Sequence, residues 1–535
     1  MDPSLRMLVT LLPEIILIAM ATWMFLGAAF SRQPSNWLLT AVLALGVSSM
    51  ALGFMNWYGM SNAQLAGAAP PISSGPVALD ALSLGVRGLA LFSGLVLAGA
   101  AAFGGGRRLS GEYLGCLLMA VAGVMLASAA MDLVFLFLAL ELISIPTYIL
   151  LFLGRSDRAS GEASIKYFLL SIVSSAILLY GFTLIYGAAG STSLPEIAAS
   201  LRGAPQPTLI TGLALVLVVA GLCFKIAAVP FHFYAPDVYQ GATSGNAGVL
   251  AVLPKIAGIV VLVRLVAVSL PGVESYGWQL AVVIAALTMT LGNLAALWQN
   301  NIRRMLAYSS IAHSGYMLIG LATAFALAET NTGRGSGLAS MLFYLAVYVI
   351  ATAGTFAALA YLGSREREVN HVDELSGLLQ THPAMAIMIS IFMFSLTGIP
   401  PLAGFWGKLS LIGGVLYAAW DTGGPVRAWL IALAIIAVLN AAASAGYYLR
   451  IVSVMCFGSA AQRVPAAGPR GALAGAGLCA ALVLLVGVLP GWLLKQSRSA
   501  GRAAITTSQT YDALGPAPQS ATETAMGDSA ADAVQ

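Results

Sequence analysis

The sequence has little charge. Only 9% of its 535 residues are Asp, Glu, Lys or Arg, whereas soluble globular proteins carry roughly 25%. This shortage, in a chain that is 59% hydrophobic, excludes an ordinary soluble enzyme and a disordered protein. The net charge of +4 is too small for a polyanion to be the main partner, so we expect no nucleic acid to bind.

Cysteine and histidine are also scarce. The chain has four histidines, and its four cysteines lie far apart without a CxxC pair. A disulfide framework or a cysteine-ligated cluster is therefore not expected. The sequence also lacks a GxGxxG motif in the strand–helix context of a dinucleotide site. We accordingly expect no redox centre and no metal on this chain.

Long hydrophobic runs dominate instead, and the mean hydropathy is +0.89. A helix needs about 20 apolar residues to cross the hydrocarbon core of a bilayer. By that length the sequence predicts an all-α polytopic membrane protein with about fourteen transmembrane helices. The expected spans are Leu8–Phe30, Trp37–Tyr58, Leu79–Phe103, Tyr113–Ala130, Leu133–Leu153, Ser164–Tyr186, Thr208–Phe233, Asn246–Ser269, Trp278–Trp298, Arg303–Leu327, Ala339–Leu362, Pro383–Tyr417, Ala428–Cys456 and Leu473–Leu493. The polar segment 495–535 is expected to be a disordered tail.

Arginines are concentrated on one side of this topology. Loops after even-numbered spans carry only Arg202, Arg334 and Arg427. Loops after odd-numbered spans carry Arg32, Arg107, Arg108, Arg155, Arg158, Arg303, Arg304, Arg365, Arg367, Arg463 and Arg470. Because basic loop residues stay on the cytoplasmic side, both termini are predicted to lie outside, on the periplasmic side of a bacterial inner membrane.

Four charged residues lie inside apolar runs. Lys225, Lys255 and Lys408 occur in CFKIAAVPF, VLPKIAGIV and GFWGKLSLI, and Glu141 occurs in LVFLFLALELISIPTYILLFL. Each such charge costs about 2.5–3.5 kcal/mol at the centre of a membrane helix. Glu141 and Lys255 lie about 12–14 Å into their spans, close to the bilayer midplane. His313 lies about 15 Å into the tenth span. It is expected to be either a proton relay or a packing residue held by hydrogen bonds.

The choice of lysine over arginine favours proton transfer. Arginine keeps its proton at any biological pH, whereas a desolvated lysine loses its proton more readily and an adjacent carboxylate restores it. Making and breaking a Glu–Lys contact would therefore switch an amine between holding and releasing a proton. The alternative is a set of static ion pairs that fix the register of the helices.

Two spans carry helix-breaking residues beside their lysines. Pro230 follows Lys225 in the seventh span, and Pro400 and Pro401 precede Lys408 in the twelfth. Proline removes a backbone donor and clashes with the preceding turn, so both helices are predicted to be interrupted. Paired interruptions of this kind are typical of inverted-repeat transporters. The predicted organisation is a three-helix segment at 1–110, five-helix repeats at 111–270 and 271–457 in opposite orientations, and a last helix at 458–494.

Four motifs in order carry a resemblance to a known family. They are ELISIPTYIL (141–150), FKIAAVPFHFYAPDVYQGA (224–242), RRMLAYSSIAHSGYML (303–318) and SLTGIPPLAGFWGKL (395–409). Over residues 75–455 the chain resembles the antiporter-like membrane subunits of respiratory complex I, the NADH-quinone oxidoreductase. Within that family the ending GFWGK is similar to the N-type subunits.

The resemblance implies a role for each buried group. Glu141 and Lys225 match the pair of the fifth and seventh helices whose rearrangement drives proton transfer. Lys255 matches the central lysine of the eighth helix, and Lys408 matches the exit-side lysine of the twelfth. His232 is a further proton-transfer candidate in the PFH motif, with a structural hydrogen bond as the alternative. The resemblance also implies discontinuous helices 7 and 12.

The predicted function is proton translocation by one subunit of a quinone-reducing complex. NADH, FMN, iron–sulfur clusters and quinone are expected on partner subunits, and the partners are the other membrane subunits, neighbouring antiporter-like subunits among them. An Mrp-type or autonomous cation/proton antiporter and a purely structural spacer remain as alternatives. Arg87, about 12 Å into the third span, is expected to snorkel or to pair with an acid of a neighbouring subunit, since arginine hardly ever deprotonates.

Overall fold

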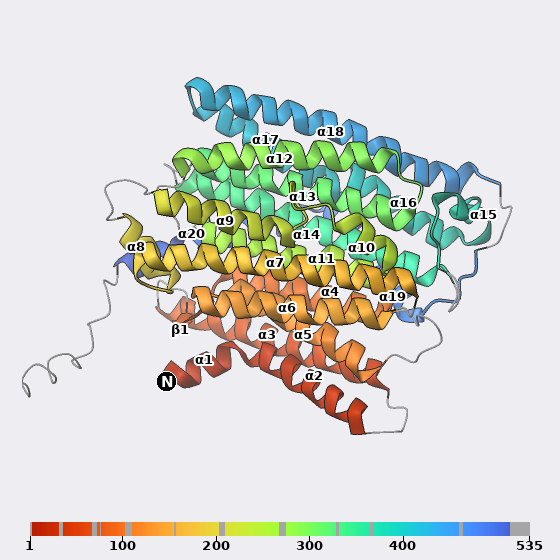
Figure 1. Cartoon of the computed structure of the whole chain (residues 1–535), viewed down its shortest axis with the longest axis horizontal. Coiled ribbons are helices and arrows are strands. Elements are labelled where there is room, and N and C mark those ends of the chain that lie inside the picture. The colour runs from red at the N-terminus through yellow and green to blue at the C-terminus, as the bar shows by residue number, and fades with distance from the viewer. Residues whose placement is uncertain are drawn as a thin grey trace, which may run out of the picture.

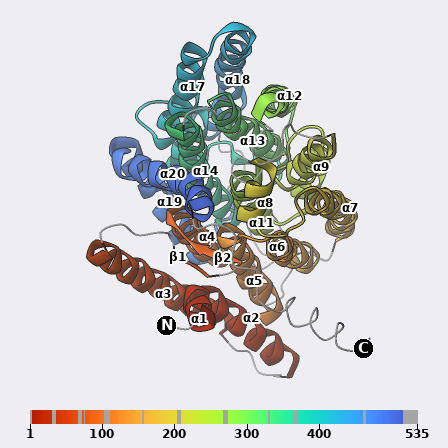
Figure 2. The ribbon, with the colours of Figure 1, turned by 90° about the vertical axis from the view of Figure 1, so that its left-hand side faces the viewer.

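Long helices lying side by side build the protein (Figure 1). The computed structural model describes residues 3–30, 36–66, 72–74, 76–101, 110–154, 157–202, 209–266, 274–327, 331–363, 368–459 and 464–513. Viewed end-on, the N-terminal helices lie at one edge of the bundle and the helices around residues 403–457 lie at the opposite edge (Figure 2). The helix of residues 331–361 runs between these edges.

The N-terminal part contains four helices and a small hairpin. Its elements are α1 (Pro3–Thr10), α2 (Leu12–Phe30), α3 (Trp37–Ala66), β1 (Ile72–Ser74), β2 (Val77–Leu79) and α4 (Ala81–Ala100). The two strands pair antiparallel, with Ile72 opposite Leu79. Asp80 begins α4 as its N-cap, because its Oδ1 accepts a hydrogen bond from the Ser83 N–H at 2.8 Å. The first expected span is divided between α1 and α2.

The middle and C-terminal parts complete the bundle. The middle elements are α5 (Gly111–Ala129), α6 (Leu133–Gly154), α7 (Arg158–Ala189), α8 (Leu194–Arg202), α9 (Leu209–Lys225), α10 (Ala235–Gly241), α11 (Ser244–Val261) and the π-helical turn η2 (Leu262–Val266). The later elements are α12 (Glu274–Leu297), α13 (Ile302–Ala326), α14 (Asn331–Tyr361), the 3₁₀ turn η3 (Val372–Leu375), α15 (Leu378–Thr381), α16 (Pro383–Thr397), α17 (Ala403–Asp421), α18 (Gly424–Phe457), α19 (Arg470–Val488) and α20 (Gly491–Ala513).

The predicted all-α membrane fold is confirmed. Eleven helices of the described chain are long and apolar enough to cross a membrane, and the shorter apolar helices α9 and α16 belong to the two interrupted spans. The count of fourteen and the inverted repeats stay predictions. Of the arginines behind the predicted orientation, Arg32, Arg107, Arg108, Arg155, Arg365, Arg367 and Arg463 lie outside the described residues.

The seventh span is interrupted, as Pro230 predicts. Helix α9 ends at Lys225, and α10 begins ten residues later at Ala235. Backbone groups freed by the break find side-chain partners on neighbouring helices. The Ile226 carbonyl accepts from Ser314 Oγ at 2.5 Å, and the Val229 N–H donates to Thr288 Oγ1 at 3.1 Å. Irregular backbone persists inside a membrane protein only where such partners exist.

The twelfth span is interrupted between α16 and α17. Gly398 ends α16 with φ +93°, a backbone conformation that side chains rarely adopt. At the start of α17 the backbone passes so close to the Ser395 carbonyl that a Cβ on Gly404 has no room. The Gly404 N–H donates to Ser395 Oγ at 3.1 Å. Both glycines therefore serve the sharp joint that Pro400 and Pro401 predict.

The expectation of a disordered tail from residue 495 is wrong for residues 495–513, which form most of α20. Helix α20 packs against α14 and α4. Its Gly501 lies so close to α14 that a Cβ there would be 2.7 Å from the Gly335 carbonyl oxygen. The small residues at this crossing let α20 pack closely against α14, and this packing stabilises a helix whose sequence is rather polar. The amino-acid composition alone does not reveal such packing. Residues 514–535 of the expected tail lie outside the described part of the chain.

Two buried ion pairs tie the N-terminal helices to each other and to the rest of the bundle. Arg87 Nε lies 2.7 Å from Glu14 Oε1, and both side chains are buried. The acidic partner of Arg87 therefore lies within this chain, so the expectation that Arg87 snorkels or pairs with a neighbouring subunit is wrong. Arg264 binds Asp80 through both guanidinium ends, at 2.6 and 2.7 Å, and donates to the Ser128 carbonyl at 3.0 Å. This second pair joins the start of α4 to the π-helical end of α11.

Removing one partner of the Asp80–Arg264 pair should destabilise the fold. We expect Arg264→Met to cost about 3–5 kcal/mol, because the buried Asp80 carboxylate loses its counter-ion. The midpoint of thermal unfolding can be followed with a thiol-reactive dye, since Cys116, Cys223 and Cys479 are buried. The double variant Asp80→Asn with Arg264→Met should recover part of the loss, because no unpaired charge remains. A midpoint equal to that of the exposed-site control Arg427→Met would contradict this role.

Candidate proton-transfer site

Glu141 and Lys225 face each other between α6 and the broken end of α9. Lys225 Nζ lies 3.9 Å from Glu141 Oε1, with 4% of the lysine side chain and 26% of the glutamate side chain exposed. Lys225 is the last residue of α9, so its ammonium group sits where the helix dipole favours a positive charge. The predicted pair therefore exists as a loose contact at a helix end.

Serine hydroxyls bind both members of this pair. Lys225 Nζ donates to Ser144 Oγ at 2.6 Å and to Ser171 Oγ at 3.5 Å. Glu141 Oε1 accepts from Ser175 Oγ. Ser171 and Ser175 lie one turn apart on α7, so a single helix face serves the acid and the amine. Because each charge keeps a hydroxyl partner, the 3.9 Å contact can lengthen or shorten without stranding either group.

Lys255 is buried on α11 without a carboxylate partner among the described ion pairs. Its Nζ donates to the Ser310 carbonyl, to Ser310 Oγ at 2.6 Å and to Tyr348 Oη at 3.4 Å. The ammonium group also lies 4.7 Å from the centre of the Tyr348 ring. Ser310 Oγ and Tyr348 Oη are themselves 2.8 Å apart. A lysine held by neutral hydroxyls in this way can exist with or without its extra proton.

His313 lies between two tyrosine hydroxyls. Its Nδ1 is 2.7 Å from Tyr344 Oη, and its Nε2 is 2.9 Å from Tyr448 Oη. In a neutral imidazole one nitrogen donates and the other accepts, so one phenol must donate to the ring while the other accepts from it. The Tyr448 hydroxyl also contacts Ser309 Oγ. Exchanging the tautomer reverses the direction of both contacts, as a proton relay requires.

Lys408 is anchored at the break of the twelfth span. Its Nζ donates to the carbonyl of Thr397, the last residue of α16, at 2.8 Å. The ammonium group lies 4.8 Å from the centre of the Tyr316 ring. The Tyr316 ring is 6.1 Å from the His313 ring and 6.0 Å from that of Tyr344. Lys408 therefore touches the group of aromatic rings that surrounds His313.

These aromatic rings form one unit, which we call the tyrosine cluster and define as Tyr316, Tyr344, Tyr348 and Tyr448. It joins three of the predicted residues, because Lys255 contacts Tyr348, His313 contacts Tyr344 and Tyr448, and Lys408 contacts Tyr316. The His313 and Tyr348 rings are 5.2 Å apart. The structure thus brings Lys255, His313 and Lys408 together around shared aromatic neighbours.

The Glu141–Lys225 pair approaches this cluster through the break in the seventh span. No described hydrogen bond joins Lys225 to Lys255. Ser314 Oγ bridges the Ile226 carbonyl at 2.5 Å and the Ser310 carbonyl at 3.2 Å, and the latter carbonyl also binds Lys255. At the position of Gly258, one turn after Lys255, a Cβ would lie 3.4 Å from Lys225 Cβ. The base of the Lys225 side chain therefore lies against α11 about one turn from Lys255.

His232 lies apart from the other candidates. It sits half-buried in the break between α9 and α10, and its Nδ1 has no hydrogen-bond partner among the described residues. Nearby, Asp237 of α10 accepts from Arg304 at 2.5 Å and from Lys166 at 3.2 Å. These two contacts of Asp237 tie the second half of the seventh span to α13 and α7. The structure therefore does not connect His232 to the line of lysines.

The tyrosines and serines of the site were missed in the sequence, although a signal exists. Ser309, Ser310, His313 and Tyr316 are spaced so that they fall on one face of α13. Tyr344 and Tyr348 share a face of α14 at a spacing of four residues. A polar stripe at helical period inside an apolar span points to this cluster. Glu14, Asp80 and Arg264 were missed as well, since their partners lie far away in the sequence.

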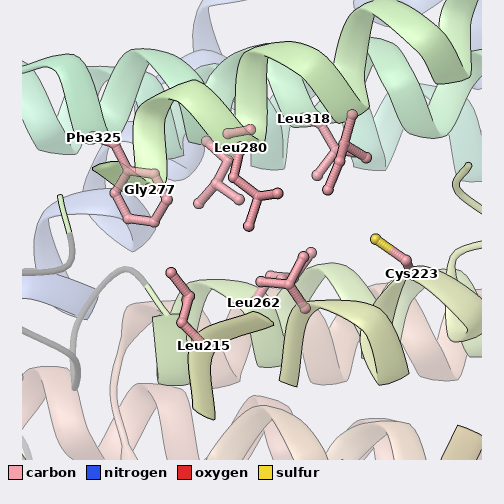
Figure 3. Close-up of a pocket in the computed structure, with 11 residues that line it drawn as sticks. Leu215, Cys223, Leu262, Gly277, Leu280, Leu318 and Phe325 are labelled. Atoms are coloured by element: carbon pink, nitrogen blue, oxygen red, sulfur yellow. The ribbon is translucent and has the colours of Figure 1, made fainter. Parts of the chain in front are cut away.

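An apolar crevice separates α9 and the end of α11 from α12 and α13 on another side of the break (Figure 3). Leu215, Leu262, Leu280, Leu318 and Phe325 point into it, and Cys223 lies at its rim. Its volume of about 20 Å³ leaves room for one water molecule without polar partners to hold it. The crevice therefore offers no polar groups along which a proton could move. Within the described residues, no group of three His, Cys, Asp or Glu side chains could hold a metal ion.

Comparison with known proteins gives matches over most of the chain. Residues 130–444 match the family model of the NADH:quinone oxidoreductase/Mrp antiporter transmembrane region. The NADH-quinone oxidoreductase subunit N of Trichlorobacter lovleyi is 42% identical over 350 residues, which cover 65% of this chain and 68% of the relative. The residues matched by the family model include Glu141, Lys225, Lys255, His313 and Lys408.

Solved structures give the same fold. A chain of respiratory complex I from Thermus thermophilus with bound aureothin is 32% identical, with a TM-score of 0.72 over 90% of this chain and 98% of that one. A chain of the Mrp complex from Dietzia is 24% identical, with a TM-score of 0.78 over 96% and 100% of the two chains, and shares the fold. The family match over more than half of the chain and the 42% identity to a curated relative lead to one conclusion. The chain belongs to the NADH:quinone oxidoreductase/Mrp antiporter family, and within it to the family of NADH-quinone oxidoreductase subunit N.

Proposed function

We propose that this chain translocates protons as a membrane subunit of a NADH-quinone oxidoreductase. The observation that carries the proposal is the line of ionisable groups from Glu141 to Lys408, which lie along the middle of the bundle in contact with serine hydroxyls and the tyrosine cluster. Intramembrane ionisable residues that face the bundle interior typically mark ion pathways. The 42% identity to a subunit N supports this assignment over that of an Mrp-type antiporter.

The first step is a change in the Glu141–Lys225 contact. At about 4 Å and an effective dielectric of 20, the attraction between the two charges is worth about 4 kcal/mol. Shortening the 3.9 Å contact holds the proton on the amine, and lengthening it lets the amine release the proton. Ser144 and Ser171 keep a polar partner beside Lys225 in either position.

The proton then passes laterally to Lys255, His313 and Lys408. Ser314 and Ser310 lie between the broken seventh span and Lys255. The Tyr348 hydroxyl contacts Lys255 and its ring neighbours that of His313, while Tyr344 contacts His313 and the Tyr316 ring contacts Lys408. Hydroxyl groups can donate and accept at once, so those of Ser310, Tyr348, Tyr344 and Tyr448 can pass a proton along their own contacts. Lys408 contacts only the face of the Tyr316 ring, whose hydroxyl donates to the Ala437 carbonyl, so the last step to Lys408 requires a bridging water molecule. His232 lies apart from this route, and its role in proton transfer stays a prediction.

The electron-transfer chemistry belongs to other chains in this proposal. NADH, FMN, iron–sulfur clusters and quinone bind to partner subunits, and this chain contacts the other membrane subunits, antiporter-like neighbours included. The complex lies in a bacterial inner membrane, with both termini of this chain on the periplasmic side, as the arginine distribution predicts. Sodium-dependent exchange by the purified chain alone in liposomes would favour the autonomous antiporter instead.

Replacing both Glu141 and Lys225 by apolar residues distinguishes a role in proton transfer from a purely structural role in holding the helices together. We expect Glu141→Leu with Lys225→Leu to leave the complex assembled, because a buried ion pair replaced by apolar groups is often neutral for stability. Proton transfer through this subunit should nonetheless fall by about 10²–10⁴, as for a lost acid–base group. The measurement is the number of protons pumped per NADH oxidised by the intact complex in proteoliposomes.

The control for this pair is Lys495→Leu, which removes an exposed lysine on α20. Lys225→Ala alone should also lower pumping, with a cost in stability from the unpaired glutamate. If the double variant pumps as many protons per NADH as the wild type, at a normal rate of quinone reduction, the two charges serve only to hold the helices in register.

The His313 contacts offer a matched pair of tyrosine variants. Tyr448→Phe removes the hydroxyl bound to His313 Nε2 at 2.9 Å, whereas Tyr447→Phe removes the neighbouring hydroxyl that donates to Asn293 at 3.0 Å. We expect the first change to slow proton translocation about tenfold or more and to alter its solvent deuterium isotope effect. The second should leave both quantities near wild type. Equal effects of the two variants would assign Tyr448 to packing alone.

A further inference from the structure

Side-chain oxygen atoms gather around the ammonium group of Lys225. Ser144 Oγ accepts a hydrogen bond from Lys225 Nζ at 2.6 Å, and Ser171 Oγ accepts one at 3.5 Å. Glu141 Oε1 lies 3.9 Å from the same nitrogen and accepts a hydrogen bond from Ser175 Oγ. We call this group the oxygen cradle and define it as the side chains of Glu141, Ser144, Ser171 and Ser175.

The chemistry of the oxygen cradle fits a small monovalent cation. Carboxylate and hydroxyl oxygens are the ligands that hard metal ions prefer. One carboxylate and one monovalent cation are neutral together, which lowers the cost of burying both. The cradle also lies at Lys225, the last residue of the broken helix α9, where the helix dipole is negative. The C-terminal ends of broken helices coordinate Na⁺ in membrane transporters.

The surrounding packing holds the oxygen cradle in place without help from the lysine. Ser144 Oγ donates to the Leu140 carbonyl at 2.8 Å, which fixes the direction of its hydroxyl group. Ser174 Oγ on α7 donates to the Gly221 carbonyl of α9 at 3.0 Å. The two helices pack so closely that a Cβ on Gly221 would lie 2.8 Å from Leu178 Cβ. Shortening the side chain of Lys225 should therefore leave the oxygen atoms where they are.

The oxygen cradle is open on the side of its carboxylate. The side chain of Glu141 is 26% exposed, whereas that of Lys225 is only 4% exposed. Ser144, Ser171 and Ser175 are buried. An ion can therefore reach the carboxylate from the surface of the chain, and it meets the hydroxyl groups farther inside.

We propose that the oxygen cradle is a Na⁺-type cation site, and that the tethered ammonium group of Lys225 occupies it. The tether supplies this ammonium group at a high effective concentration, which a free ion has to exceed. Two positive charges in one cradle repel each other, so the protonated lysine excludes Na⁺. An amine that has released its proton still fills the space between the hydroxyl groups. Lys225 thereby makes the route selective for protons against Na⁺. This selectivity rests on the proposed function, whereas the cation site does not.

The other two buried lysines have surroundings that suit Na⁺ less well. Lys255 contacts the neutral oxygens of Ser310 and Tyr348, and Lys408 contacts the Thr397 carbonyl and the face of the Tyr316 ring. These contacts supply no negative charge to a metal ion. Shortening Lys408 is therefore a matched control, because it also removes a buried ammonium group.

Thermal unfolding of the intact complex in two salts tests the site. In Lys225→Ala the oxygen cradle keeps its carboxylate and loses its cation, so Na⁺ should bind there and stabilise the folded subunit. We expect NaCl to raise the unfolding midpoint of this subunit by about 1–2 °C relative to choline chloride at the same concentration. Choline is too bulky for the cradle, so the comparison removes the general effect of ionic strength. The midpoint is read from the soluble fraction of this subunit, quantified by mass spectrometry over a series of temperatures.

Three control variants should show no difference between the two salts. Lys225→Met fills the oxygen cradle with an apolar side chain of similar length. Lys225→Ala with Glu141→Gln keeps the space and the hydroxyl groups but removes the carboxylate. Lys408→Ala removes a buried lysine elsewhere in the bundle. The site is overturned if Lys225→Ala gives the same midpoint in both salts, or if Lys408→Ala gains as much from NaCl as Lys225→Ala does.

The wild-type complex tests the selectivity without any substitution. Protons pumped per NADH in proteoliposomes should stay the same when NaCl replaces choline chloride. A number that falls with rising NaCl would show that the tethered ammonium group does not exclude Na⁺, and would overturn the selectivity. Normal pumping by Lys225→Ala would instead contradict the proton route, on which the unfolding measurement does not depend.

Discussion

An amine buried in a membrane must find an acceptor, and this constraint shapes the site more than any other. Three lysines lie inside the bundle, and only Lys225 has a carboxylate within ion-pair distance among the described residues. Lys255 and Lys408 depend on neutral acceptors instead, namely the Ser310 hydroxyl and the carbonyls of Ser310 and Thr397. Neutral acceptors stabilise the protonated amine less than an acid does, so these two lysines can part with a proton at a smaller energetic cost.

The helix breaks supply some of these acceptors. A continuous helix uses each of its carbonyls internally, whereas an interrupted helix leaves several without a partner. In the twelfth span the freed Thr397 carbonyl binds Lys408, and in the seventh span the freed Ile226 carbonyl binds Ser314, which leads to the acceptor of Lys255. The interruptions therefore position the chemistry as well as bend the chain. This explains why proline lies close to lysine in both spans.

The sequence predicts the fold class and the buried charges well, because both depend on properties read along the chain. Hydropathy locates spans, proline locates breaks, and a lysine in an apolar run is conspicuous by itself. Partners distant in the sequence are not readable in this way, so Arg264 and Asp80, 184 residues apart, escaped notice. The tyrosine cluster escaped because phenols count as hydrophobic in composition, although their period on α13 and α14 is visible. Helix α20 was mistaken for a tail because its stability comes from packing against α14 rather than from its own composition.

Among the described ion pairs with a buried cation, the choice of cation separates two kinds, whereas the pairs of Lys166 and Arg304 are more exposed. Arg87 holds Glu14, Arg264 holds Asp80, and Arg303 on α13 holds Glu368. At Asp80 the arginine makes two contacts, of 2.6 and 2.7 Å. Lysine faces Glu141 across a longer gap of 3.9 Å. A guanidinium never gives up its proton and binds a carboxylate in a fixed fork, whereas an ammonium group is a single point charge that can lose a proton. Arginine therefore suits the pairs that must stay closed to keep the helices in register. Lysine suits the one ion pair that opens in the proposed route, because an opened ammonium group can release its proton.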